Sequence, residues 1–242
     1  MNHSIQIIPY PSLALAFIPA AIVIAILFFW TREYKTEIYG FSRMLGQLLL
    51  VGYFLSYIFE SDSTLIVLLV ITVMVLASSS IALRTVKQKW RQLYWRSFIA
   101  ILFGGGAVLA LVTQGVLTLD PWYLPSYFIP LAGMIFANSM NSVSLAADRL
   151  YAEAGRGLPF ETARNIALRS SLIPMTNALF AVGLVSLPGM MTGQILSGVS
   201  PLIAVRYQIM VMCMVFGAAG ISSALFLTLI KPDYPENIPS NK

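Results

Sequence analysis

The sequence predicts an all-α, polytopic membrane protein, built as a bundle of about seven transmembrane helices. Composition is the first reason, because 58% of the 242 residues are hydrophobic and only 10% are charged, whereas soluble domains are about 45–50% apolar and about 25% charged. The second reason is that the apolar residues form long runs with short polar connections between them. A chain this short cannot bury so much apolar surface in a soluble core, so lipid is expected to cover most of it.

Each expected crossing is a run of mostly apolar residues close to the length of about 17–25 residues that a spanning helix needs. In chain order the seven runs are Leu13–Trp30, Met44–Phe59, Leu65–Leu83, Ser97–Val116, Tyr127–Ala147, Leu172–Leu187 and Tyr207–Ile230. The first run is expected to be a crossing and not a cleaved signal peptide, since no lysine or arginine precedes it. The second and sixth runs are short, so we expect them to extend into their flanks or to lie tilted.

The basic residues predict the orientation, because Lys and Arg accumulate in cytoplasmic loops. Basic residues follow the first run, and further basic groups lie in 84–96 and 148–171. When the crossings alternate, fourteen of the fifteen Lys and Arg residues, all except Arg206, fall on one side. Residues 1–230 are therefore expected to form a single transmembrane domain with the N-terminus outside, followed by a disordered cytoplasmic tail over 231–242.

Several classes of protein are excluded by what the sequence contains. A single cysteine, Cys213, excludes an intrachain disulfide, and a single histidine, His3, excludes a histidine-rich zinc site. The sequence has no G-x-x-x-x-G-K-[ST] run and so no ATP-binding P-loop, and no Ser/His, paired-Asp or H-E-x-x-H arrangement lies inside the crossings. The basic residues stand in short blocks between apolar runs, a pattern that favours membrane orientation over nucleic-acid binding.

The longest polar connection, Asp148–Ser171, is a candidate surface for a partner protein. It contains a possible short helix around Leu150–Ala154, a break at Gly155-Arg156-Gly157 and a second helix beginning near Pro159, a residue type favoured in the first helical turn. A short helix parallel to the membrane here could bind a partner, or the connection could be an ordinary amphipathic linker. The basic segment Arg84–Arg96 could likewise contact a partner, or it could bind anionic lipid headgroups.

Polar residues inside the crossings are candidates for a substrate path. Asn138, Asn141 and Ser142 recur at i, i+3 and i+4, so they share one face of a helix. Polar side chains in hydrocarbon need partners, so this face is expected to point inward. It either lines a path or forms hydrogen bonds between packed helices, and Asn177 in the sixth run allows the same two readings.

The stretch SLPGMMTG, residues 186–193, interrupts the apolar sequence without introducing a charge. Pro188 lacks an amide hydrogen and Gly189 lowers helix stability. At membrane depth the freed backbone groups are tolerated only where protein or a water-filled cavity satisfies them. The stretch is therefore either a helix end at the outer surface or a broken element at a translocation path, and residues 188–205 are either a loop or a re-entrant helix.

Methionine is abundant towards the end of the chain. Eight of the eleven methionines lie in or beside the last three crossings: Met134, Met140, Met175, Met190, Met191, Met210, Met212 and Met214. Thioethers bind soft metals such as Cu(I), but methionine more often fills irregular packing. The sequence alone therefore assigns no metal ligands.

Five stretches carry a family resemblance: RMLGQLLLVGYFLSYIF (43–59), IPLAGMIFANSMNSVSLAADRL (129–150), RSSLIP (169–174), VGLVSLPGMMTGQILSG (182–198) and RYQIMV (206–211). Together they resemble the FetB-type permeases, the membrane subunits of a small family of ABC transporters. The family is linked to iron export in bacteria and, in plants, to aluminium tolerance and in one case to UDP-glucose transport. The resemblance covers nearly the whole chain, and the Leu-Pro-Gly-Met-Met-[Ser/Thr]-Gly run is specific to the family.

The resemblance implies that a separate ATPase subunit, in two copies, binds ATP and Mg²⁺, and that this chain binds no cofactor and pairs with a second copy of itself. It also implies a cytoplasmic coupling helix within residues 148–170. The candidates for coupling to the ATPase are Arg149, Glu153, Gly155, Gly157 and Pro159. The candidates for the substrate path are Asn138, Asn141, Ser142, Asn177, Pro188, Gly189, Met190 and Met191.

Two departures from the family pattern concern these sites. Asn177 and Phe180 stand where the family has an acid and a lysine, and Gly155–Pro159 replaces the family's Gly-Ala-Thr/Ser-Pro order. We expect a non-enzymatic permease subunit of the inner membrane that exports a metal ion such as iron, or a related small solute. The alternatives are a sugar nucleotide or a lipid as substrate, and a membrane scaffold or sensor that transports nothing.

Overall fold

The structure is a computed structural model that describes residues 8–32, 34–59 and 63–234, and every regular element in these ranges is helical. The predicted all-α class is therefore confirmed. The chain divides into two compact units, residues 1–61 and 62–242, which are described separately. Five helical spans in the described residues are long and apolar enough to cross a membrane: Tyr10–Trp30, Thr64–Ala82, Arg91–Val116, Pro125–Gly155 and Pro201–Leu229.

The first unit contains α1 (Tyr10–Leu15), α2 (Phe17–Trp30) and α3 (Lys35–Phe59). Ala16 separates α1 from α2, and the two together form the first candidate span. No side chain of α2 is buried within the protein, and its residues are apolar on every side, as expected for a helix surrounded by lipid. α3 begins nine residues before the run expected to form the second crossing, so the helix extends into the flank of that run.

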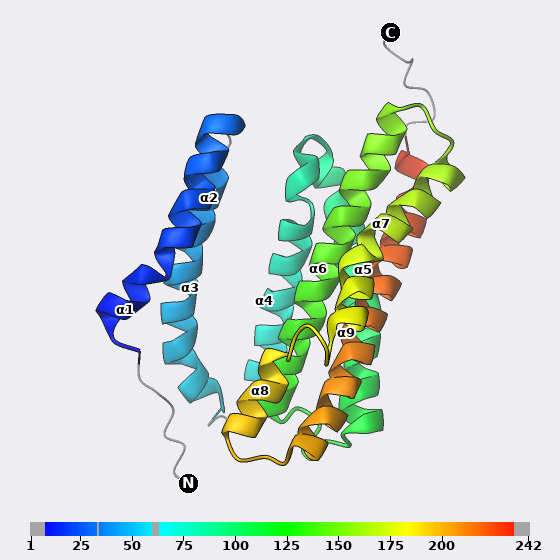
Figure 1. The fold of residues 1–242 in the computed structure, drawn as a ribbon. Helices are drawn as coiled ribbons and strands as arrows, with labels where there is room; N and C mark the ends of the chain where they lie inside the picture. Colours follow the sequence, from blue (N-terminus) through cyan, green and yellow to red (C-terminus); the bar gives the residue numbers. More distant parts are fainter. Residues whose placement is uncertain (1–7, 33, 60–62, 235–242) are drawn as a thin grey trace. The chain divides into compact units, whose positions relative to one another are not determined.

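The second unit is a bundle around one central helix. It consists of α4 (Thr64–Ala82), α5 (Trp90–Ala110), α6 (Pro125–Gly155), α7 (Phe160–Ala181), α8 (Gly189–Leu196) and α9 (Pro201–Leu229), with the short segments η1 (Arg84–Lys89), η2 (Leu111–Val116) and η3 (Lys231–Asp233). α6 packs against α4, α5, α7 and α9, and its inner face is fully buried (Figure 1). The core of this unit therefore lies along α6.

Glycine brings α5 close to its neighbours. A Cβ atom on Gly104 would lie 2.6 Å from Ser222 Oγ and 2.8 Å from Ser222 Cα, and one on Gly105 would lie 2.9 Å from Ile135 Cγ2. Helix α5 continues without interruption through these residues. Gly104 and Gly105 thus permit close approach of α9 and α6, as small residues do in membrane helix bundles.

The sixth expected crossing differs from the prediction. Helix α7 ends at Ala181, six residues before Leu187, and a turn over residues 182–188 leads into α8. At 1.5 Å per residue α7 is about 33 Å long against about 46 Å for α6, and α8 adds about 12 Å. α7 and α8 therefore match the length of α6 only together, and the turn between them lies along the bundle and not beyond its end (Figure 1).

The basic segments of the second unit gather at one end. Figure 1 places η1, the α6–α7 connection and η3 at one end of the bundle, and the start of α9 towards the opposite end. This arrangement agrees with the prediction that successive connections between the helices lie on alternate sides of the membrane. The side that faces the cytoplasm and the total of seven crossings stay predictions, because α3 and α7 cover the second and sixth expected crossings but are not among the five spans.

Candidate functional site

The α6–α7 connection forms the tip of a helical hairpin. Helix α6 runs through Leu150–Ala154 to Gly155, and α7 begins at Phe160 with Pro159 as its N-cap residue. The expectation of a separate short helix at Leu150–Ala154 was wrong, because nothing before Gly155 interrupts α6. The predicted coupling segment is thus the last turns of one long helix and the first turns of the next.

Gly157 ends α6 through its backbone conformation. Its φ is +76°, its amide donates to Ala154 O at 2.9 Å, and the amide of Leu158 donates to Glu153 O at 3.3 Å. This is the Schellman arrangement, in which a left-handed residue, usually glycine, satisfies the last carbonyls of a helix. The break predicted at Gly155-Arg156-Gly157 is therefore confirmed.

Glu153 is a buried carboxylate held by two arginines. Its side chain is 2% exposed, and Oε1 lies 2.5 Å from Arg149 Nη2 and 2.9 Å from Arg156 Nη1. Removing one partner of such a buried pair leaves an uncompensated charge, which is strongly destabilising. Glu153 therefore fixes the tip from inside, while the Arg156 side chain remains 64% exposed.

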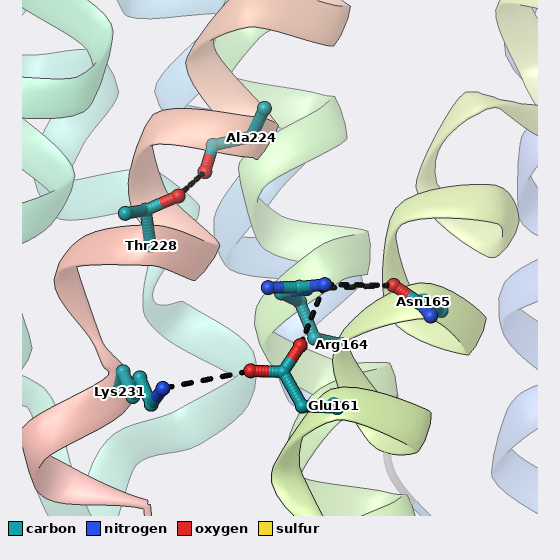
Figure 2. Close-up of polar contacts among 6 residues, drawn as sticks. All are labelled: Glu161, Arg164, Asn165, Ala224, Thr228 and Lys231. Carbon is teal, nitrogen blue, oxygen red and sulfur yellow. Dashed lines mark hydrogen bonds and ion pairs between the residues drawn. The ribbon is translucent and has the colours of Figure 1, made fainter.

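The end of α9 is attached to this hairpin by a group of residues that we call the C-terminal clasp: Leu158, Phe160, Glu161, Lys231 and Tyr234. Figure 2 shows Glu161 between two cations, with Oε1 3.5 Å from Lys231 Nζ and Oε2 2.6 Å from Arg164 Nη2. Lys231 Nζ also lies 5.8 Å from the centre of the Phe160 ring. Exposed ion pairs contribute little stability singly, so this part of the clasp chiefly sets position.

Tyr234 is the buried part of the clasp. It is 7% exposed, its hydroxyl donates to Leu158 O at 2.6 Å, and its ring meets Phe160 edge to face at 5.2 Å. Burial, and secondly the negative charge of Glu153, raise the pKa of the phenol, so the group stays a donor. Residues 231–234 are thus ordered, in contrast to the disordered tail expected from residue 231 onward; residues 235–242 lie outside the described part.

Buried serines join the helices of the bundle. Ser142 Oγ lies 2.6 Å from Ser223 Oγ and donates to Ser171 O at 3.3 Å, while Ser222 Oγ donates to Ser139 Oγ at 3.0 Å. These hydroxyls connect α6 with α7 and α9. Ser142, one of the substrate-path candidates, therefore forms hydrogen bonds between packed helices.

The turn between α7 and α8 satisfies its own backbone amides. The five amides of residues 182–186 donate to the carbonyls of Ala178, Ala181 and Ser186 at 2.8–3.2 Å, and Gly183 adopts a φ of +85°. Pro188 is the N-cap residue of α8, and Gly189 is its first residue. Residues 188–205 are therefore neither a loop nor one re-entrant helix, but a short helix, a brief connection and the first turn of α9.

Beside this turn, a pocket of about 340 Å³ lies among α6, α8 and α9. Its lining residues carry no formal charge: Leu117, Ser126, Tyr127, Pro130, Leu131, Met134, Met190, Tyr207 and Met210. Leu117 directly follows η2, a π-helical segment, and such segments often occur at functional sites. The volume falls in the range of small-molecule sites, which are mostly apolar with a few polar groups.

The outer face of α6 continues from the pocket towards the hairpin tip. Asn138 follows Met134 by one turn and donates from Nδ2 to Met134 O at 2.8 Å. Asn141 is exposed, as is Asn177 on α7, whereas Ser142 is buried. The expectation that Asn138, Asn141 and Ser142 all point inward is therefore wrong for Asn141, because the helix turns it to the outside.

The structure brings only some of the predicted residues together. Met190 lines the pocket and Pro188 and Gly189 start the helix that carries it, while Met191 is half-buried outside the lining. The candidates for coupling to the ATPase do lie together at the hairpin tip. Sequence reasoning missed the pocket walls at Tyr127 and Tyr207; two signals pointed to this region, the methionine enrichment and the proline–glycine interruption at Pro188 and Gly189.

A multi-pass helical membrane protein is the class that these helices and their apolar outer surfaces define. The chain belongs to the family described as "Uncharacterised protein family (UPF0014)", whose model matches residues 10–157 and 159–234. It is 34% identical to the "Probable iron export permease protein FetB" of Escherichia coli, over 91% of this chain and 90% of that protein. The predicted resemblance is thereby confirmed.

Two further relatives lie in other lineages. The chain is 37% identical to the UPF0014 membrane protein slr1647 of Synechocystis, over 72% of this chain and 73% of that one. It is 32% identical to the protein ALUMINUM SENSITIVE 3 of Arabidopsis thaliana, over 88% of this chain and 83% of that one. No solved structure matches the chain.

Proposed function

We propose that this chain is the permease subunit of an ATP-driven transporter, energised by a separate ATPase subunit. The match to FetB carries the proposal, because it spans 91% of this chain and 90% of a protein named as an iron export permease. Five apolar helices supply the membrane domain that such a subunit needs. The proposed substrate is a metal ion such as iron, or a related small solute, and the proposed direction is export.

The substrate path would run through the pocket and along the outer face of α6, past Met134 and Asn138. Three facts support this location: the pocket is large enough for a small solute, Asn138 donates to the backbone of the lining residue Met134, and α8, which follows the break after α7, supplies Met190 to the lining. Interrupted helices mark binding sites in many transporters. Alternating access requires two arrangements that bind substrate differently, and α8 is the element whose movement would change the pocket.

Coupling to the ATPase would occur at the hairpin tip. Gly155, Arg156, Gly157 and Pro159 are exposed there, on a base that Glu153 holds rigid. Helix α6 runs from this tip to Met134, and the clasp links the tip to α9, which carries Met210. A displacement at the tip would thus reach two walls of the pocket through two rigid helices. ATP and Mg²⁺ would bind to the partner subunit.

Two copies of the chain would form the transporter. Asn141 and Asn177 are exposed on α6 and α7, and amide side chains at membrane depth need polar partners. A second copy would cover these exposed amides. Cross-linking of Asn141→Cys in a Cys213→Ser background should give a covalent dimer; an uncrosslinked monomer would remove this part of the proposal.

The coupling is tested by co-purification with a candidate ABC-type ATPase subunit from the same organism. Gly155→Glu adds a charge at an exposed glycine of the tip that has open space around it and leaves the partners of Glu153 in place, and Arg206→Glu is the control at an exposed position outside the tip. We expect Gly155→Glu to abolish both association and permease-stimulated ATP hydrolysis, and Arg206→Glu to preserve both. If the two subunits never associate, or both variants behave alike, the assignment of the tip fails.

Transport is tested in proteoliposomes that contain both subunits. ATP-dependent flux of Fe²⁺ is compared with flux of a sugar nucleotide and of a labelled lipid. Flux of one of these that disappears with a hydrolysis-deficient ATPase supports the proposal and names the substrate. An ATPase cycle without movement of any of them counts against a permease.

A membrane scaffold or sensor is the second candidate, because Ser142 shows that some polar residues in the bundle serve packing only. Asn138→Leu separates the two functions. In a permease it lowers flux without lowering the amount of folded protein. In a scaffold it changes stability alone.

A further inference from the structure

Three methionines from three different helices line the pocket. Met134 comes from α6, Met190 from α8 and Met210 from α9, and all three line the same volume of about 340 Å³. They are separated by as many as 76 residues in the sequence, so no local pattern brings them together. Methionine has an unbranched side chain with three rotatable bonds, so its sulfur can adapt to an occupant.

The donor atoms that the lining offers are soft or neutral. Besides the three thioethers, the polar groups of the lining are the hydroxyls of Ser126, Tyr127 and Tyr207. Thioethers select soft ions such as Cu(I), whereas carboxylates, carbonyls and water suit hard ions. Two tyrosine rings add faces that attract a cation at short range.

The lack of charged residues in the lining also limits which ions the pocket can hold. None of the nine lining residues is acidic or basic. The cost of moving an ion from water into an apolar site grows with the square of its charge, and without an opposite charge it is not offset. A monovalent ion is therefore accommodated far more easily here than a divalent or trivalent one.

We propose that Met134, Met190 and Met210 form a binding site for a soft monovalent cation, Cu(I) or Ag(I). Binding itself is independent of any ATPase; only the statement that this ion is transported rests on the function proposed above. If the bound ion is transported, the pocket selects it by thioether coordination, and α8 controls access because it supplies one of the three ligands.

The test uses the purified full-length chain and Ag(I), which needs no reductant. Cys213 is exposed and its thiol also binds silver, so every variant is made in a Cys213→Ser background. Bound silver is measured after desalting against free methionine as competitor. We expect saturation at about one silver ion per chain, with no comparable binding of Fe²⁺ or Zn²⁺.

The decisive variants replace each ligand by leucine, a change that conserves volume and core packing. Met134→Leu, Met190→Leu and Met210→Leu should each weaken silver binding about tenfold or more, and the triple variant should abolish it. Met212→Leu, on the same helix as Met210 but outside the lining, is the matched control and should bind normally. If the triple variant does not fold, the three single variants decide.

Three outcomes overturn the inference: unchanged silver binding in the pocket variants, an equal loss in Met212→Leu, or tighter binding of Fe²⁺ at the same residues. The two proposals fail separately. Silver binding without ATPase association refutes the permease, while ATP-driven flux of another solute without silver binding refutes only the methionine site.

Discussion

Two neighbouring glycines in α5 should respond oppositely to the same substitution. At Gly104 a Cβ atom would lie 2.6–2.8 Å from three atoms of Ser222, two of them in the backbone. At Gly106 it would meet nothing within 4 Å. Since carbon atoms normally pack at about 3.5–4.0 Å, Gly104→Ala forces α5 and α9 apart, whereas Gly106→Ala adds a methyl group to open space.

The expected difference in stability between the two variants follows from two contributions. Alanine in place of glycine inside a helix is favourable by about 1 kcal/mol, and this gain is common to both variants. Overpacking at Gly104 costs about 1–3 kcal/mol, because the clash is with backbone and cannot be relieved by a rotamer change. The propensity gain cancels in the comparison, so the two variants should differ by about 1–3 kcal/mol.

The assay is thermal unfolding of the purified protein in one detergent, with both variants measured beside the wild type. We expect Gly106→Ala to be at least as stable as the wild type and Gly104→Ala to be the less stable of the two variants. Equal Tm values for the two variants would refute the close approach of α5 to α9. A second readout is the Ser222–Ser139 hydrogen bond: Ser222→Ala in the Gly104→Ala background should then cost less than it does alone.

Three further predictions concern the hairpin tip and the core. Tyr234→Phe removes the hydrogen bond to Leu158 O and should cost about 1 kcal/mol at neutral pH, seen as faster amide exchange in 156–163. The fold raises the pKa of Tyr234 above its ordinary value of 10.0. The stability that depends on the protonated phenol is therefore complete below pH 10 and is lost as pH rises through the folded pKa. Tyr234→Phe should lack this loss of stability at alkaline pH. Gly157→Ala should cost about 1–2 kcal/mol because its φ is +76°, whereas Gly155→Ala, helical and with open space around it, should be neutral or stabilising in the same melting assay. Gln208 is 6% exposed and its Oε1 lacks a hydrogen-bond partner among the described residues, so Gln208→Leu should leave Tm unchanged or raise it; a large loss of stability would show that this oxygen has a partner.

The helices of this protein could be predicted because they depend on local sequence. A run such as Leu65–Leu83 is apolar over the length of a bilayer, and the helix observed, Thr64–Ala82, matches it to within one residue at each end. The predicted sixth run ends at Leu187, six residues beyond the end of α7, because Pro188, a strong helix breaker, directly follows it in the sequence. Proline is compatible with the start of a helix, and the interruption begins earlier, where Gly183 adopts a positive φ.

The site could be predicted only in part. Pro188, Gly189 and Met190 were identified because a proline and a glycine inside an apolar run are visible in the sequence itself. The pocket depends on Met134, Met190 and Met210, which only the packing of α6, α8 and α9 brings together. The clasp was not foreseen for the same reason, since Tyr234 lies in a polar, proline-containing stretch and contacts Leu158, 76 residues earlier.

The turn between α7 and α8 differs from an ordinary helix kink in one respect that affects how the protein can move. A kink leaves carbonyl or amide groups that a neighbouring helix has to satisfy, so bending it further in hydrocarbon carries a penalty for each group exposed. Here residues 182–186 donate within their own segment. Rotation of α8 as a rigid body about residues 187 and 188 leaves those five bonds intact, so reorienting α8 costs none of the amide hydrogen bonds of the turn.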